Sequence, residues 1–263
     1  FDTVDRNMLL SAAEAGNSRA QFILGRLNDP TYGLPEMNNA VQSVKWYQKA
    51  AEQGLAEAQN NLGRMYEDEV GVAKSDVDAV KWYRKAADQG FATAQNNLGL
   101  MYDKGQGVEQ DFKAAAQWYR KAAEQGVADT QSNLGVMYAN GRGFEQDFKE
   151  AEKWYRKAAE QGFPQAQNNL GAIYSEGQGV EQDFKEAVKW FQKAADQWNA
   201  NGKGVEPNFV TAYAWWDIAA TNGEQNAKKS LPQVAKVMTP AQIAKAEELV
   251  KEMIKKNPKL IQE

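Results

Sequence analysis

Two residue types are missing from this chain of 263 residues, which contains neither histidine nor cysteine. Their absence excludes a Ser-His-Asp triad, a cysteine nucleophile, and metal sites built on imidazole or thiolate groups. Disulfides are excluded as well, so the sequence gives no redox indication of its compartment. Among enzyme classes, a hydrolase that uses carboxylates is not excluded by these absences.

The chain also lacks a strong charge of either sign and a long apolar run. Its net charge is −4 at pH 7, which produces no field that would attract nucleic acid or an anionic membrane. No apolar stretch approaches the roughly 20 residues that a membrane-spanning helix requires. We therefore expect no nucleic-acid partner and no membrane insertion.

What the sequence does contain is an internal repeat: Gly54 and Gly90 stand 36 residues apart, and this spacing continues without slippage. The four complete copies cover residues 51–86, 87–122, 123–158 and 159–194, and a partial copy begins at Ala13. The repeated tryptophans are Trp46, Trp82, Trp118, Trp154 and Trp190. Such a fixed period is the signature of stacked structural repeats.

Each copy contains two amphipathic helical patterns separated by a glycine-rich loop. The apolar positions of one copy are Ala94, Leu98, Met101 and Tyr102, followed by Ala115, Trp118, Tyr119 and Ala122. Between the two patterns, Gly105 is placed to end the first helix and Asp111 to cap the second. A single helical hairpin cannot bury both of its apolar stripes, so we expect neighbouring hairpins to stack.

The recurring pattern AxAQxNLGxMYxxGxGVxxDxxxAxxWYxKAAxQG resembles the Sel-one-like repeat family, a relative of the tetratricopeptide repeats, over roughly residues 11–223. The resemblance implies an all-α fold, a right-handed α-solenoid of stacked helix-turn-helix repeats. It also implies a scaffold for protein complexes. In bacteria such proteins often act in the envelope or are secreted, so the periplasm or secretion is favoured, while the cytoplasm stays open. The chain does not begin with Met, and a removed signal peptide is one explanation.

We expect the repeat array to occupy residues 1–228 in about six units, of which the sixth is shortened. From Trp190 to the equivalent Trp215 the step is 25 residues instead of 36, and the residues absent near 198–200 are those of the first helix. The stack either tolerates the gap as a soft break or leaves a notch near Trp198 that a partner fills. A soft break predicts faster amide exchange at 195–205 than at 115–120.

Residues 229–263 are expected to form a terminal helix that caps the array. Thr239 is a suitable N-cap, Pro240 fits the first helical position, and Gln242 completes a capping box. The apolar stripe of this helix is Ile243, Ala246, Leu249, Val250 and Ile254. A solenoid needs such a cover over its last apolar face, although a dedicated partner-binding helix is the alternative.

Asparagine recurs inside the first helix of each repeat, although it is a poor residue for a helix interior. Its side-chain amide either ties one hairpin to the next or lines a binding groove. The tetratricopeptide resemblance implies that first helices line a concave groove, where an asparagine can hold a ligand's backbone or carboxylate. The equivalent positions Arg64, Leu100 and Val136 differ between copies, so we expect the fold to leave them free to encode specificity for an apolar or amphipathic peptide. The candidate partner-binding residues are Asn60, Asn61, Arg64, Asn96, Asn97, Leu100, Asn133, Val136, Asn168 and Asn169.

Two other repeated features have structural interpretations. The GQGV and GRGF loops follow helices and lack the spacing and lysine of a phosphate loop, so turn glycines explain them. The mid-helix glycines, Gly63 and Gly99 among them, indicate close helix packing that offsets their cost. The Trp-Tyr pairs have core spacing, with a stacking platform for bases or sugars as the alternative.

The carboxylates, such as Asp111, Asp147 and Asp183, recur with the repeat, whereas a catalytic pair would break the symmetry of the array. We therefore expect no catalytic residues, no cofactor and no metal. The chain is interpreted as a non-catalytic, monomeric scaffold or adaptor that binds a protein or peptide on its concave face. One alternative is an immunity or inhibitor protein that neutralises a toxin or effector enzyme. The other is an envelope glycan-binding or hydrolytic module.

Overall fold

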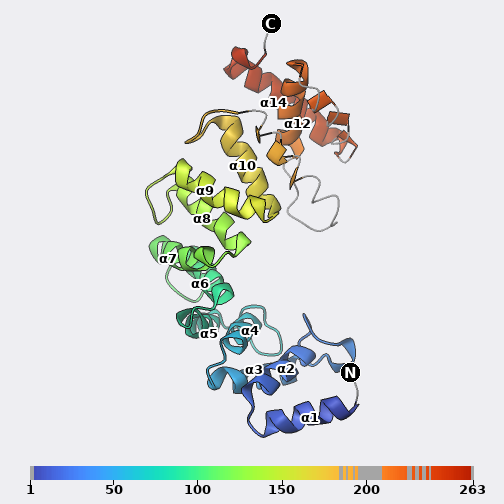
Figure 1. Ribbon diagram of the computed structural model, residues 1–263, viewed down its shortest axis with the longest axis vertical. Helices are drawn as coiled ribbons and strands as arrows, with labels where there is room; N and C mark the ends of the chain where they lie inside the picture. Colours follow the sequence, from blue (N-terminus) through green and yellow to red (C-terminus); the bar gives the residue numbers. More distant parts are fainter. Residues whose placement is uncertain are drawn as a thin grey trace. The chain divides into compact units, whose positions relative to one another are not determined.

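Helices and short turns make up the whole described part of the chain, which contains no strand (Figure 1). The computed structural model describes residues 3–183, 186–187, 189–191, 193–194, 209–223, 227–228, 231–232, 235–236 and 238–261. The all-α expectation is therefore confirmed.

The helices form two compact units, Phe1–Thr130 and Gln131–Glu263. The helices that begin in the first unit are α1 (Thr3–Glu14), α2 (Ser18–Asn28), the short 3-10 helix η1 (Pro35–Met37), α3 (Ala40–Glu52), α4 (Ala56–Glu67), α5 (Asp76–Asp88), α6 (Ala92–Lys104), α7 (Phe112–Glu124) and α8 (Ala128–Asn140). The chain continues with α9 (Phe148–Glu160), α10 (Pro164–Glu176), α12 (Phe209–Thr221), α14 (Pro240–Lys256) and η2 (Pro258–Leu260).

From α1 to α7 each helix packs on the next along the chain, as α2 does on α3, α4 on α5 and α6 on α7. From α2 to α10, the even-numbered helices are the first helices of their repeats and the odd-numbered helices are the second. The 36-residue pattern has thus become a stack of helical hairpins, as expected.

The predicted helix ends are confirmed where the structure describes them. Gly105 follows α6 with a φ of 66°, a left-handed conformation that ends a helix and suits glycine. The Asp111 side chain accepts hydrogen bonds from two backbone amides of α7. At α14, Thr239 and Gln242 form the expected reciprocal capping box.

The mid-helix glycines admit a tyrosine ring from the second helix of the same hairpin. A Cβ atom on Gly63 would lie 2.8 Å from Tyr83, and one on Gly99 would lie 2.7 Å from Tyr119. Tyr83 and Tyr119 are buried. Close packing therefore accounts for these glycines, as predicted, because the absent side chain makes room for an aromatic ring.

The predicted core position of the Trp-Tyr pairs is confirmed for the tyrosines, whereas some of the tryptophans are only partly buried. Trp82 and Trp190 are buried, whereas Trp46, Trp118 and Trp154 are only half-buried. A lysine three residues later lies over each half-buried indole ring, with its ammonium 4.6 Å from the ring centroid at Trp46 and 4.1 Å at Trp118. The cation can cover the exposed face of the ring because residues three apart share one side of a helix.

In the second unit, α14 packs against α12. Ala246 and Val250 of the predicted stripe are buried against Trp216, while Ile243, Leu249 and Ile254 are half-buried at the edge of this cluster. The Asn222 side chain donates a hydrogen bond of 2.6 Å to the Leu260 carbonyl and so holds η2 to the end of α12. The proposed boundary between an array of residues 1–228 and a cap of residues 229–263 stays a prediction.

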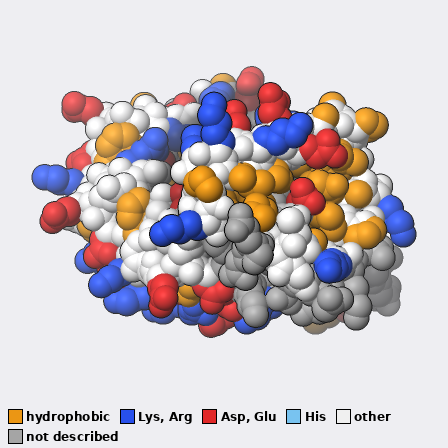
Figure 2. All heavy atoms as spheres, turned by 90° about the horizontal axis from the view of Figure 1, so that it is seen from above, with side chains coloured by type: hydrophobic (Ala, Val, Ile, Leu, Met, Phe, Trp, Pro, Cys, Tyr) orange, Lys and Arg blue, Asp and Glu red, His pale blue; other side chains and the backbone are white. Residues whose placement is uncertain are grey.

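Three expectations lie outside the described residues: the missing helix near 198–200, the notch near Trp198, and the exchange behaviour of residues 195–205. Within the described part, no helix combines the length and apolarity needed to cross a bilayer. Acidic and basic side chains are interspersed over the face seen in Figure 2, in keeping with a net charge of −4.

Candidate functional site

The candidate residues of the first unit lie on α4 and α6, the first helices of two successive repeats. The helix α2 is the equivalent first helix one repeat earlier. We call the surface formed by Ile23, Arg26, Asn61, Arg64, Asn97 and Leu100, together with the buried side chains directly beneath them, the first-helix face. Asn60 and Asn96 are buried, with exposed fractions of 7% and 6%. Asn61, Asn97 and Leu100 are half-buried, so they are the members that a partner can reach.

A ladder of side-chain amides connects α6 to α4. The Asn97 Nδ2 atom donates to Asn60 Oδ1 over 3.1 Å, and Asn60 Nδ2 donates to Asn61 Oδ1 over 3.4 Å. Asn96 Nδ2 donates in turn to Asp129 Oδ2 over 3.4 Å. These bonds support the interpretation that the asparagines tie one hairpin to the next, and they hold the Asn61 and Asn97 amides in place.

Arg64 lies at the end of this ladder and is fixed by an ion pair. Its Nη2 atom is 2.5 Å from Asp29 Oδ2, and the Asp29 side chain is fully buried. Tyr47 donates a hydrogen bond of 3.1 Å to the same carboxylate. The expectation that the fold leaves this position free is therefore wrong for Arg64, because a buried carboxylate requires a charged partner. The role of Arg64 in partner binding stays a prediction.

The Tyr47 hydroxyl belongs to the same buried cluster. Burial raises its pKa far above the ordinary value, and the negative charge of Asp29 raises it further, against smaller opposing effects of Asn61 and Arg64. Tyr47 is therefore neutral and acts as a hydrogen-bond donor to Asp29. The cluster is structural in character, since it holds the segment after α2 to α3 and α4.

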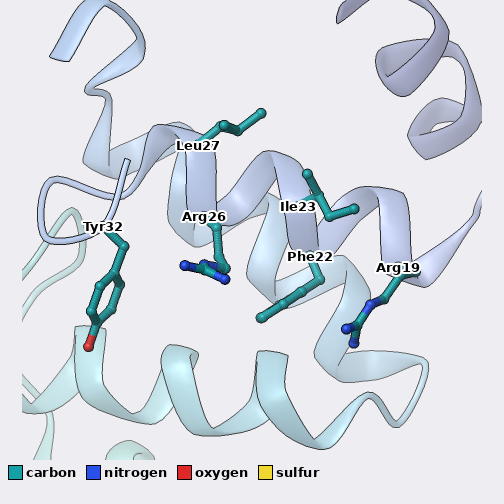
Figure 3. A pocket seen from close by; sticks show the side chains of 6 residues that line it. All are labelled: Arg19, Phe22, Ile23, Arg26, Leu27 and Tyr32. Atoms are coloured by element: carbon teal, nitrogen blue, oxygen red, sulfur yellow. The ribbon is translucent and has the colours of Figure 1, made fainter. Parts of the chain in front are cut away.

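One feature of the first-helix face escaped the sequence analysis: α2 carries a pocket. Phe22, Ile23 and Arg26 stand where the next repeat has Asn60, Asn61 and Arg64. The lining side chains are Arg19, Phe22, Ile23, Arg26, Leu27 and Tyr32 (Figure 3). The signal is present in the sequence, where the first copy has AQFILGRL in place of AQNNLGRM.

Charged side chains flank this pocket. Arg19 Nη1 lies 2.7 Å from Glu57 Oε1 on α4. Burial would raise the pKa of the Glu57 carboxyl, but the hydrogen bond and charge of Arg19 outweigh this and leave the pKa below its usual value. The Arg64 guanidinium lies 5.1 Å from the centroid of the Tyr32 ring. The pocket thus adjoins the asparagine ladder through Arg64.

The remaining candidates lie in the second unit, on α8 and α10. Asn133, Val136 and Asn169 are half-buried, whereas Asn168 is buried. Gln165 Nε2 donates to Asn169 Oδ1 over 3.3 Å. Asn168 Oδ1 accepts no hydrogen bond within the described part of the chain.

A second network that the sequence analysis missed consists of glutamines. Gln89 Nε2 donates to Gln59 Oε1 over 2.7 Å, and Gln59 Nε2 donates to the Ala51 carbonyl over 3.0 Å. Gln125 and Gln95 repeat the first contact at 2.8 Å. Each buried glutamine therefore bridges its own hairpin to the end of the preceding one. The recurrence of glutamine at the 36-residue period was the available signal.

The structure also contains a pair of neighbouring carboxylates that does not follow the repeat. Burial, with a contribution from the negative charge of Glu247, raises the pKa of Asp217 on α12. Both residues lie outside the complete 36-residue copies, so the sequence analysis did not single them out. Among the described residues, no group of acidic side chains could hold a metal ion.

Stacked helical hairpins that follow a 36-residue period and are joined by recurring glutamine hydrogen bonds define an α-solenoid of the tetratricopeptide-like class. The Sel1 repeat model matches residues 18–55, 56–91, 92–127, 128–163, 164–197 and 198–224. The chain belongs to the Sel1 repeat family, whose members generally mediate protein–protein interactions.

Solved structures of this family resemble the chain to different degrees. A Sel1 repeat protein from Oxalobacter formigenes is 38% identical, with a TM-score of 0.67 over 73% of this chain and 78% of that one. A protective antigen of uropathogenic Escherichia coli with an SLR fold is 25% identical over 97% and 88%, with a TM-score of 0.31. An immunity protein from Pseudomonas aeruginosa is 21% identical over 89% and 81%, with a TM-score of 0.46. No curated protein matches the chain.

Proposed function

We propose that this chain is a non-catalytic scaffold or adaptor that binds a partner protein or peptide on its first-helix face. Membership of the Sel1 repeat family supports the general role, since these repeats typically serve as interaction scaffolds. The choice of surface depends on the geometry of α2, α4 and α6.

One observation carries the choice of surface: the framework repeats while the first-helix face varies. The glycine that admits a tyrosine ring is present at Gly25, Gly63 and Gly99. By contrast, the half-buried or exposed position next to it changes from Arg26 to Leu100. A surface that differs between identical supports can distinguish one partner from another.

The side chains of this face suit an extended peptide. The half-buried amides of Asn61 and Asn97 each contain a donor and an acceptor, which is what a peptide backbone requires. Leu100 offers an apolar contact beside them. Because the asparagine ladder holds these groups in place before binding, little conformational entropy is lost when a partner docks.

The test uses affinity capture from the native source with Leu100→Asp and a matched control, Val77→Asp. Val77 is 67% exposed and belongs to α5, a second helix, instead of to one of the first helices that carry the face. We expect wild type and V77D to retain one partner and L100D to lose it, because a charge placed in an apolar contact must be desolvated. Titration calorimetry with the purified partner should show binding at least about tenfold weaker for L100D.

The thermal unfolding of each variant is the control for folding. If L100D unfolds like wild type and still captures the same partner with unchanged affinity, the first-helix face is not the binding surface. If V77D loses the partner as well, the effect does not belong to this face.

The two alternatives are separated by the behaviour of the captured partner. An immunity protein would form a one-to-one complex that abolishes the partner's enzymatic activity. A glycan-binding or hydrolytic module would bind or cleave purified envelope polysaccharide without any protein present. Nothing in the described part of the chain favours either over the scaffold, since the structural neighbours with an immunity description show the fold alone.

A further inference from the structure

The pocket on α2 interrupts the polar character of the first-helix face. Phe22 and Ile23 replace the asparagine pair, so the amide ladder that joins Asn97, Asn60 and Asn61 has no equivalent side chains on α2. At this end, a partner therefore meets hydrocarbon instead of amide groups. This apolar end belongs to the same first-helix face, because Phe22 and Ile23 on α2 are the equivalents of Asn60 and Asn61 on α4.

The pocket has an ordered floor and apolar walls that are open to solvent. Phe22 is 8% exposed, and its ring centroid lies 5.9 Å from that of Tyr47, which holds it in place. Ile23 and Tyr32 are 38% and 52% exposed. In Figure 3 the other lining side chains project from α2, while Tyr32 comes from the segment that follows this helix. Apolar side chains left in water beside a preformed hollow are typical of a ligand site.

The charges around the pocket are not balanced. Arg19 is paired with Glu57 and Arg64 with Asp29. Arg26 is exposed at the pocket and forms no ion pair with any residue that the structure describes. An unpaired guanidinium next to exposed hydrocarbon is complementary to an apolar group that carries or adjoins a carboxylate.

We propose that the α2 pocket is the anchor subsite for the partner peptide and takes a bulky apolar side chain next to an aspartate or glutamate. The apolar side chain packs on Phe22, Ile23 and Tyr32, and the neighbouring carboxylate pairs with Arg26. This inference rests on the proposed function, because it assumes that the peptide continues along the first-helix face toward Asn61 and Asn97.

The experiment probes the full chain with an array of short peptides. Each peptide carries a central Leu, Phe or Ser flanked by Asp, Glu, Ser or Lys, so that the array reports both the central and the flanking preference. We expect wild type to prefer the acidic flanks over lysine by about tenfold, the usual effect of one charged hydrogen bond. Arg26→Glu should reverse this preference toward lysine, and Ile23→Asp should abolish the selection for a central apolar residue.

Arg6→Glu is the matched control, because it makes the same change of charge at an exposed position on α1 outside the pocket. Its peptide selection should equal that of wild type. Identical selection by R26E and wild type would overturn the proposal, as would the absence of acidic–apolar peptides among those bound. Thermal unfolding shows whether each variant is folded. If I23D does not fold, R26E still tests the proposal, because it leaves the apolar lining of the pocket unchanged.

The same variants separate this inference from the proposed function. If L100D weakens the binding of the captured partner while R26E and I23D do not, the first-helix face binds the partner but the pocket is not its anchor. If none of the three weakens it, the proposed function of the face fails as well. Sedimentation velocity tests whether a second copy of the chain occupies the pocket instead of a peptide. A wild-type dimer that I23D converts to a monomer would show this and would also overturn the proposal.

Discussion

At the scale of single residues, equivalent positions in the repeats have acquired different tasks. Asn60 is buried and bridges two hairpins, whereas the equivalent residue in the first copy, Phe22, forms the floor of a pocket. Arg64 compensates the buried Asp29, while Leu100 at the same position is a half-buried apolar side chain. Repeat equivalence therefore predicts where a side chain lies but not which contact it makes.

The Asp29–Arg64 pair provides the prediction at this scale. Arg64→Ala should lower the free energy of unfolding by about 3 kcal/mol, because it leaves a fully buried carboxylate without its charged partner. Arg64→Ala combined with Asp29→Asn should recover part of this loss. Urea denaturation measures both.

Arg19→Ala is the comparison, since the Arg19 side chain is 61% exposed in its pair with Glu57. An exposed ion pair contributes about 1 kcal/mol or less. Equal losses for Arg19→Ala and Arg64→Ala would show that burial of Asp29 does not set the stability of this cluster.

At the scale of elements, one glycine in each first helix sets how closely the hairpin closes. Glycine normally weakens a helix, but here the missing side chain lets an aromatic ring, a tyrosine at every described position except Phe191 at Gly171, approach the backbone of the first helix. The glycine and the tyrosine are therefore one packing unit, repeated along the stack. The outer faces of the helices are free to vary around it.

Gly99→Ala tests this packing unit. Although alanine favours the helix, its Cβ would lie 2.7 Å from Tyr119 Cδ1, so we expect a net loss of about 1–2 kcal/mol in the free energy of unfolding. A double-mutant cycle with Tyr119→Ala, followed by urea denaturation, should show strong coupling, because alanine at position 99 no longer clashes once the ring is absent. A stabilised G99A variant would mean that the ring can shift without cost.

At the scale of the whole molecule, the repeated buried tyrosines give the chain a common response to alkaline pH. Burial raises the pKa values of Tyr47, Tyr83, Tyr119 and Tyr155 far above the ordinary value. The unfolded chain releases these protons at about pH 10, whereas the folded chain retains them. Stability is therefore fully present below about pH 10 and is lost progressively as the pH rises above that value toward the raised pKa values of the folded chain.

We expect the urea midpoint, followed by circular dichroism, to fall steeply between about pH 9 and pH 11. Tyr155→Phe should reduce the loss, because burial is the cause of the raised pKa of this residue and the variant has no hydroxyl to titrate. Complete ionisation of the tyrosines near pH 10, with an unchanged circular dichroism spectrum, would contradict the prediction.

The sequence by itself determined the repeating part of this protein. The 36-residue period predicted the helices, the hairpins, the glycine at the end of α6 and the aspartate cap of α7. It did so because apolar periodicity and helix caps are local properties, and because each copy repeats the same evidence. The close approach implied by the mid-helix glycines was predicted for the same reason.

Only the tertiary structure decided what departs from the period. Asn60 and Asn61 are adjacent at the edge of one apolar stripe, and which amide is buried depends on the neighbouring hairpin. Arg64 meets Asp29, 35 residues away in the chain, through an ion pair that Leu100 at the equivalent position cannot form. The Asp217–Glu247 pair likewise depends on side chains that α12 and α14 bring together. Such contacts are set by the packing of one helix against another, which no local pattern in the sequence encodes.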